Sequence, residues 1–123
     1  ATHDALGEND RTSTGFLPPP EFERMADAFF GQPRQSVRGW ERAIDAQRRI
    51  VAAVQAIDRI DTTPGTLAIV SHGAVGALLQ CWLADAPISR QRDQPANGGG
   101  NWFGFTLEPR TLHSPWRPID AAG

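Results

Sequence analysis

A short apolar run between two helical patterns is the sequence feature that most constrains the fold. Residues 66–71 read Thr-Leu-Ala-Ile-Val-Ser, are rich in β-branched side chains and follow a turn signal at residues 62–65. A run of this kind is typical of a buried parallel strand. On either side, residues 36–60 predict one long amphipathic helix capped by Ser36, and residues 74–84 predict an apolar helix. Helix, strand and helix in this order predict a layered α/β fold.

The remaining predicted elements are shorter and are separated by turn-forming residues. Residues 1–20 include three consecutive prolines and predict a loop, whereas residues 21–30 predict a short helix with acidic residues near its start. The loop predicted for residues 85–101 ends in a glycine-rich stretch. After it, residues 102–107 predict a strand, and residues 111–119 predict an edge strand interrupted by prolines.

Length and composition indicate one soluble globular domain. A chain of 123 residues has the usual size of a single domain, and 40% hydrophobic with 21% charged residues is a globular composition. The formal net charge of -2 argues against nucleic acid as a partner, because nucleic acid is usually bound by basic surfaces. No apolar stretch is long enough to span a membrane and the N-terminus has no signal pattern, so we expect a cytoplasmic protein without a membrane partner.

The sequence offers little support for a disulfide, a metal site or a bound cofactor. The only cysteine, Cys81, lies in an apolar run and is expected to be a buried hydrophobic residue. No spacing of His, Cys, Asp and Glu matches a zinc or calcium site, and no glycine pattern matches a nucleotide-binding loop, so we expect no cofactor. The four tryptophans are expected in the core or an interface, and Trp102 is a candidate for the mouth of a pocket.

The candidate functional site begins at His72, which follows the predicted strand and precedes the predicted apolar helix. Ligands of open α/β sheets gather at such positions. The backbone N–H groups and the positive dipole end of the helix attract an anion such as phosphate, and Gly73 allows the ligand to come close. His72 is then able to donate to a phosphate oxygen. The same residues also fit a histidine that merely caps the helix, and this alternative remains open at this point.

Several segments, taken in chain order, form a larger pattern. They are Leu6-Gly7-Glu8-Asn9-Asp10-Arg11, Thr14-Gly15-Phe16-Leu17-Pro18, Glu21-Phe22-Glu23, Val70-Ser71-His72-Gly73 and Gly99-Gly100-Asn101. Together they resemble the later part of a domain of the histidine phosphatase superfamily, also called phosphoglycerate mutase-like, over nearly the whole chain. The resemblance implies a three-layer α/β/α sandwich and phosphoryl transfer through a phosphohistidine. It also implies that His72 and Gly73 hold the phosphoryl group, that Glu8 is the acid/base residue, and that Arg11 contacts phosphate.

One part of the family pattern is missing from the chain. In that family the nucleophilic histidine lies in an Arg-His-Gly motif at the end of the first strand, but His3 and His113 have neither the arginine before them nor the glycine after them. The resemblance therefore implies that residues 1–123 form a single, partial domain without the first strand and first helix. A fragment of a longer protein and a natural truncation both fit this pattern.

The resemblance leaves three hypotheses for the function. The first is hydrolysis of phosphomonoesters through a phosphohistidine on a residue missing from this chain, and the second is a phosphomutase that transfers the group to another acceptor. The third is a catalytically inactive relative that serves as an anion-binding or protein-interaction module. The expected partner is a small phosphorylated substrate or inorganic phosphate, and unpaired sheet edges would also favour a homo-oligomer.

Overall fold

Helices make up most of the regular structure in the computed structural model, which describes residues 3–61, 68–95 and 99–119. In these ranges the α-helices are α1 (Pro19–Gly31), α2 (Ala43–Ile60) and α3 (Gly73–Leu83). The 3-10 turns are η1 (Asp4–Leu6), η2 (Val37–Gly39) and η3 (Arg90–Arg92). The strands are β1 (Asn101–Trp102), β2 (Phe105–Thr106), β3 (Thr111–Leu112) and β4 (Arg117–Pro118). None of the described helices is both long enough and apolar enough to cross a bilayer.

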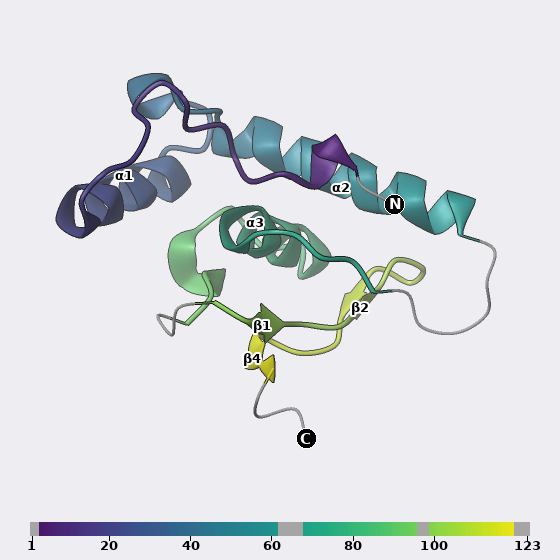
Figure 1. The fold of residues 1–123 in the computed structure, drawn as a ribbon. Helices are drawn as coiled ribbons and strands as arrows, with labels where there is room; N and C mark the ends of the chain where they lie inside the picture. The colour runs from purple at the N-terminus through teal and green to yellow at the C-terminus, as the bar shows by residue number, and fades with distance from the viewer. Residues whose placement is uncertain (1–2, 62–67, 96–98, 120–123) are drawn as a thin grey trace.

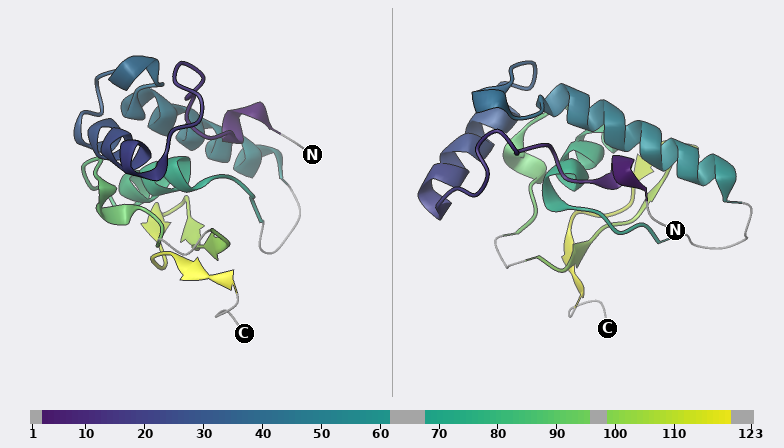
Figure 2. Two further views of the ribbon diagram at one scale, coloured as in Figure 1. Left: turned by 60° about the vertical axis from the view of Figure 1, so that its left-hand side comes forward. Right: turned by 45° about the horizontal axis from the view of Figure 1, so that its top comes forward.

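Helix α3 lies at the centre of the molecule, between α2 and the strands (Figures 1 and 2). Its sequence is apolar throughout except for Gln80. A helix that is apolar on all sides is stable in water only when all its sides are covered. Val75, Ala77 and Leu78 accordingly have 0% of their surface exposed, and Cys81 is buried as predicted. Because α3 is held from both sides, the position of its N-terminus is fixed.

Helix α1 and the Trp40 ring form a second part of the core. Phe29 and Phe30 of α1 are buried, and the Trp40 ring centroid lies 6.1 Å from that of Phe29 and 6.1 Å from that of Phe22. The helix begins with Pro19, which fits a first turn because a backbone N–H there would have no partner inside the helix. The helices predicted at residues 21–30 and 74–84 are thus confirmed, with ends shifted by one or two residues.

The single helix predicted for residues 36–60 is wrong at its start. Helix α2 begins at Ala43, and the residues before it form the separate turn η2, in which Arg38 has a positive φ of 48°. Ser36 does not cap a helix, because its hydroxyl donates to the backbone carbonyl of Trp40 at 2.6 Å. The turn directs the Trp40 ring into the core, where it is 2% exposed. Burial of a large indole ring stabilises this arrangement more than one further helical turn would.

The strand predicted for residues 66–71 is wrong over its described part. Residues 68–71 form no strand, and Val70 is 89% exposed. The physical reason is that a strand needs a neighbour to pair its backbone groups, and no strand pairs with residues 68–71 within the described ranges. Residues 66 and 67, and the turn predicted at residues 62–65, lie outside the described residues.

The strands predicted at residues 102–107 and 111–119 are each broken into two short strands. Gly104 interrupts the first run and Pro115 the second, in agreement with the poor fit of both residues in strands. Strand β1 pairs with β4 and β2 with β3, both antiparallel. The register places Trp102 opposite Arg117 and Phe105 opposite Leu112. Helices combined with small sheets are compatible with the predicted α/β class.

Gly76 allows the Trp116 ring to lie directly on α3. A Cβ at Gly76 would lie 2.6 Å from Cη2 of Trp116, and this ring is held in place because its Nε1 donates to the carbonyl of Arg92 at 2.8 Å. We expect Gly76→Ala to lower the free energy of unfolding by about 1–3 kcal/mol, the usual cost of overpacking a core. Urea denaturation of the full-length gene product measures this change.

The matched control is Gly31→Ala in α1, because a Cβ at Gly31 meets no atom within 4 Å. A loss of stability for Gly76→Ala that does not exceed the change for Gly31→Ala would contradict the close packing of Trp116.

Candidate functional site

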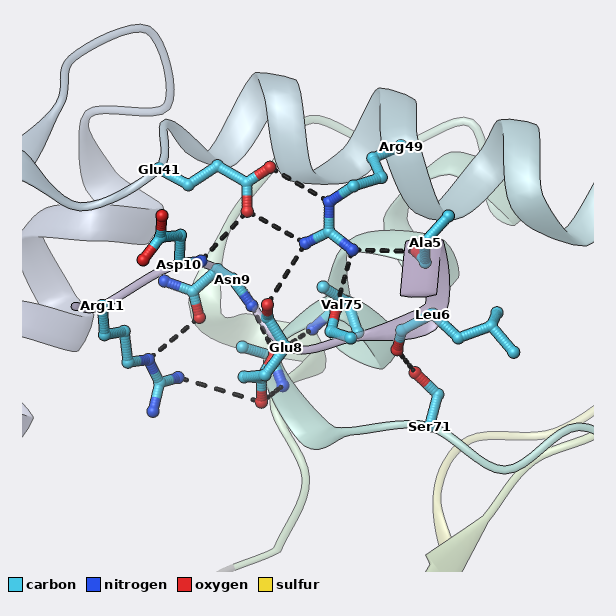
Figure 3. Close-up of polar contacts among 12 residues, drawn as sticks. Ala5, Leu6, Glu8, Asn9, Asp10, Arg11, Glu41, Arg49, Ser71 and Val75 are labelled. Atoms are coloured by element: carbon cyan, nitrogen blue, oxygen red, sulfur yellow. Dashed lines mark hydrogen bonds and ion pairs between the residues drawn. The ribbon is translucent and has the colours of Figure 1, made fainter. Parts of the chain in front are cut away.

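Arg49 of α2 holds the chain from Ala5 to Glu8 beside the start of α3 (Figure 3). Its Nη1 donates to the carbonyl oxygens of Ala5 and Gly7, each at 2.8 Å. Its Nη2 donates to the carbonyl oxygen of Glu8 at 3.3 Å. Three carbonyl groups, one in η1 and two in the irregular segment after it, are thereby tied to one side chain of a long helix, so the backbone at Glu8 has a defined position.

Glu41 completes the hydrogen bonding of Arg49. Its carboxylate accepts from Arg49 Nε at 3.1 Å and from Nη2 at 2.9 Å, so all five N–H donors of the guanidinium are used. The same carboxylate accepts from the backbone N–H of Asp10 at 3.1 Å. The hydrogen bonds that Arg49 donates to Glu41 raise the pKa of Arg49, and burial opposes this shift. The pair therefore fixes both ends of the segment that carries Glu8.

The carboxylate of Glu8 caps the N-terminus of α3. Oε2 accepts from the backbone N–H of Ala74 and Oε1 from that of Val75, each at 3.0 Å, and Oε1 also accepts from the N–H of Asn9 at 3.2 Å. His72 occupies the N-cap position, but its side chain makes no capping hydrogen bond. The first N–H groups of a helix have no partner within the helix, and its dipole favours a negative charge there. Glu8 therefore supplies the cap that the local sequence lacks.

Arg11 brings a positive charge to Glu8. Its Nη2 lies 3.8 Å from Oε2 of Glu8, and its Nε donates to Oδ1 of Asn9 at 3.0 Å. The guanidinium carbon lies 4.8 Å from the ring centroid of Phe22 and 5.0 Å from that of Trp40, distances typical of cation–π contacts. Burial lowers the pKa of Arg11, while the nearby charge of Glu8 raises it. Arg11 is thus a cation held in a fixed place by two aromatic rings.

His72 and Gly73 line a cavity of about 450 Å³ on the side of α3 that faces the strands. His72 is exposed and Gly73 is half-buried. Gln94 and Asn101 add polar groups to the same cavity, and its other walls are largely apolar. Trp102 also lines this cavity and is 41% exposed, in line with its prediction as a residue at a pocket mouth. An apolar cavity with a few convergent polar groups is the usual form of a small-molecule site.

The structure brings together some of the residues predicted for the site and separates others. Glu8 and Arg11 meet at the N-terminus of α3, directly after His72 in the chain. Arg11, however, lines a different hollow from the one that His72 and Gly73 line. Two of the N–H groups expected to bind phosphate are also occupied by the carboxylate of Glu8. An anion can use those two donors only when this carboxylate moves away.

Three residues around the site, Arg49, Glu41 and Gln94, were not predicted from the sequence. Arg49 and Glu41 lie among other charged residues, and their pattern does not distinguish a half-buried ion pair from a solvated helix face. One signal for this ion pair is present in the sequence. Glu41 and Arg49 have opposite charges and lie eight residues apart, on either side of the start of α2. Gln94 lies in a loop, where the sequence contains no periodicity to indicate its surroundings.

Comparisons with known proteins connect this geometry to a family. A model of the histidine phosphatase superfamily (branch 1) matches residues 18–114. The matched range includes His72 and Gly73, whereas Glu8 and Arg11 precede it. A search of curated proteins gave no significant match. Because the family match covers well over half of the chain, this chain belongs to the histidine phosphatase superfamily.

Proposed function

We propose that this chain is part of a phosphoryl-transfer enzyme that hydrolyses small phosphomonoesters through a phosphohistidine on a residue outside these 123 residues. Membership of the histidine phosphatase superfamily supports phosphoryl transfer in general. The observation that carries the proposal is the contact of the Glu8 carboxylate with the N–H groups of Ala74 and Val75, each at 3.0 Å. This contact brings a carboxyl group to the helix start that His72 precedes.

Each residue has a defined role in the proposed reaction. His72 donates to oxygens of the phosphoryl group, and the backbone N–H of Gly73 is a second donor, so that charge developing on the equatorial oxygens is stabilised. The bond from phosphorus to the ester oxygen breaks as the bond to the nucleophilic nitrogen forms. Glu8, in its protonated carboxylic acid form and released from the N–H groups of Ala74 and Val75, gives its proton to the leaving oxygen. Water then attacks phosphorus, the phosphorus–nitrogen bond breaks, and Glu8 takes the proton from the water. Arg11 stabilises negative charge next to Glu8.

The proposal also includes the fold of the larger protein. Residues 1–123 form one partial domain, and a first strand and helix from outside these residues complete a three-layer α/β/α sandwich. The family match supports this larger fold, and the 89% exposure of Val70 beside the cavity indicates apolar surface that a neighbouring element would cover.

Hydrolysis of p-nitrophenyl phosphate by the full-length gene product tests the proposed function. We expect His72→Ala to lower kcat/KM by about 10²-fold, the typical loss when one donor to the developing charge is removed. His113→Ala is the matched control, because His113 is also exposed and does not line the cavity. Release of inorganic phosphate separates hydrolysis from transfer to another acceptor. Full activity of the His72→Ala protein would contradict the proposal.

A second candidate function is a binding module without catalytic activity, and exposed apolar residues favour it. Val70 is 89% exposed, Ile119 is 61% exposed, and both line the cavity beside His72. Exposed apolar surface of this kind is typical of sites that associate with another chain. Light scattering over a series of concentrations tests this candidate with the full-length gene product. A protein that stays monomeric and hydrolyses phosphomonoesters would contradict it.

A further inference from the structure

The side-chain amide of Gln94 lies against the backbone of Gly73. A Cβ at Gly73 would lie 2.2 Å from Nε2 of Gln94 and 2.8 Å from its Cδ, so the amide occupies the space that only a glycine leaves free. Gln94 and Gly73 line the same cavity as His72. A polar group is therefore present next to the two residues proposed to hold the phosphoryl group.

Asn101 determines which end of the Gln94 amide faces Gly73. Nδ2 of Asn101 donates to Oε1 of Gln94 at 3.0 Å. Because the carbonyl end of the amide is engaged by this donor, the NH₂ end with its two N–H donors is turned toward Gly73. The hydrogen bond from Asn101 thus selects one of the two possible orientations of the Gln94 amide. In this orientation the NH₂ group lies beside Gly73, in the wall of the cavity.

The backbone on both sides of this amide pair is also held in place. Gly99 and Gly100 have φ values of +103° and +70°, which turn the chain into β1, and the N–H of Ile119 donates to the carbonyl of Gly100 at 2.9 Å. The N–H of Gln94 donates to Oδ1 of Asp93 at 2.9 Å. Oδ2 of the Asp93 carboxylate accepts from Nε of Arg90 at 3.0 Å. Arg90 also forms ion pairs with α1, so this loop is attached to the helix. Neighbours that are fixed in this way hold a side-chain donor in the position from which it can bind a ligand.

We propose that Gln94 is a further phosphate-binding residue of the phosphoryl-transfer site, and that Asn101 is a positioning residue for its amide. The Gln94 NH₂ donates to an oxygen of the phosphoryl group that His72 binds, and the inference rests on the proposed function. The apolar walls of the cavity include Phe103 and Trp116. A hydrogen bond to a charged oxygen is stronger in such surroundings than in water. This role also accounts for the Gly-Gly-Asn segment, which brings Asn101 to Gln94.

Inhibition by inorganic phosphate tests the inference in the full-length gene product. We expect Gln94→Glu to raise the inhibition constant of phosphate more than tenfold, because a donor is replaced by a negatively charged acceptor of the same shape. Gln94→Ala removes the amide without adding charge and is expected to raise this constant about tenfold, in keeping with the loss of one hydrogen bond to a charged group. Gln91→Glu is the matched control, since Gln91 is exposed and does not line the cavity.

Asn101→Leu tests the positioning role separately. A leucine in this place removes the donor to Oε1 of Gln94 without adding charge, so the Gln94 amide is no longer held in one orientation. The inhibition constant of phosphate should rise by no more than in Gln94→Ala, while a second substitution, Asn101→Leu in the Gln94→Ala protein, should add less than twofold. A purely structural role would instead give additive effects.

The outcomes separate this inference from the proposed function. If Gln94→Glu and Gln94→Ala both keep phosphate inhibition within twofold of the Gln91→Glu control while His72→Ala loses activity, the role of Gln94 is wrong and the proposed function stands. If His72→Ala keeps full activity, the proposed function itself fails. Thermal denaturation of each variant identifies any change caused by unfolding, and the Gln94→Ala protein remains informative if Gln94→Glu does not fold.

Discussion

Replacing Arg49 with methionine is expected to lower the free energy of unfolding by about 2–3 kcal/mol. The variant leaves the carbonyl oxygens of Ala5, Gly7 and Glu8 without their donor, and it leaves the Glu41 carboxylate without its ion-pair partner. Loss of one partner from a buried pair costs about 3–5 kcal/mol, and the value here is lower because the Arg49 side chain is 26% exposed. Arg49→Lys should recover less than half of the loss, since an ammonium group cannot form the same forked contacts.

Urea denaturation of the full-length gene product, followed by tryptophan fluorescence, measures this prediction. Arg48→Met is the matched control, because Arg48 is the neighbouring residue of α2 and is exposed. The same two variants also test whether the Arg49 contacts affect activity, because Arg49 fixes the backbone at Glu8. In the active protein kcat should therefore fall for Arg49→Met and stay close to its original value for Arg48→Met. Equal stabilities of the two variants would contradict the role assigned to Arg49.

Replacing Trp40 with alanine is expected to have the largest effect on stability, a loss of about 3–5 kcal/mol. The ring is 2% exposed, and it packs against Phe22 and Phe29 of α1. Its Nε1 donates to Oγ1 of Thr14 at 2.8 Å, so the ring also connects the N-terminal segment to the core. A methyl group in this place would leave a cavity and one hydroxyl group without its donor.

Two further variants separate the contributions of Trp40. Trp40→Phe keeps most of the packing and loses the hydrogen bond to Thr14, so we expect it to recover more than half of the stability lost in Trp40→Ala. Trp102→Ala removes a ring that is 41% exposed and should cost less than about 1 kcal/mol. Chemical denaturation followed by far-ultraviolet circular dichroism is suitable for all three variants. A Trp40→Ala protein as stable as the Trp102→Ala protein would contradict the core described above.

Elements determined by local pattern could be predicted from the sequence. Helix α1 has apolar residues at helical spacing between a proline start and a glycine end, and α3 is apolar from end to end. Both were predicted to within two residues. The start of α2 could not be predicted in this way, because the helical spacing continues through Val37 and Trp40. Contacts of Trp40 with distant rings, which no local pattern contains, decide the conformation there.

Strands depend on partners that are distant in the sequence, and their prediction was less successful. The run at residues 66–71 has the composition of a strand, but its described part pairs with no strand in the described ranges. Residues 102–107 and 111–119 do pair with each other, in two short ladders rather than one. Backbone hydrogen bonds between strands require a neighbour as well as a suitable sequence.

The candidate site could be predicted in outline only. The family resemblance implied a joint role for Glu8 and the residues at the start of α3, and the structure places the Glu8 carboxylate in contact with that helix end. The sequence did not indicate that the carboxylate itself would occupy the N–H groups of Ala74 and Val75. It also did not indicate the Gln94 amide beside Gly73, because such contacts arise between loops whose relative positions depend on the whole fold.

Titration of the ¹⁵N-labelled full-length gene product with inorganic phosphate most directly tests whether His72 and the start of α3 form one phosphoryl site. Saturable shifts of the Gly73 amide and of the His72 ring resonances are expected, together with a loss of the Gly73 shift in the His72→Ala protein. A smaller shift of the Ala74 and Val75 amides is expected if phosphate displaces the Glu8 carboxylate. Resonances at the start of α3 that do not respond to phosphate, or that respond equally in the His72→Ala protein, would contradict the account.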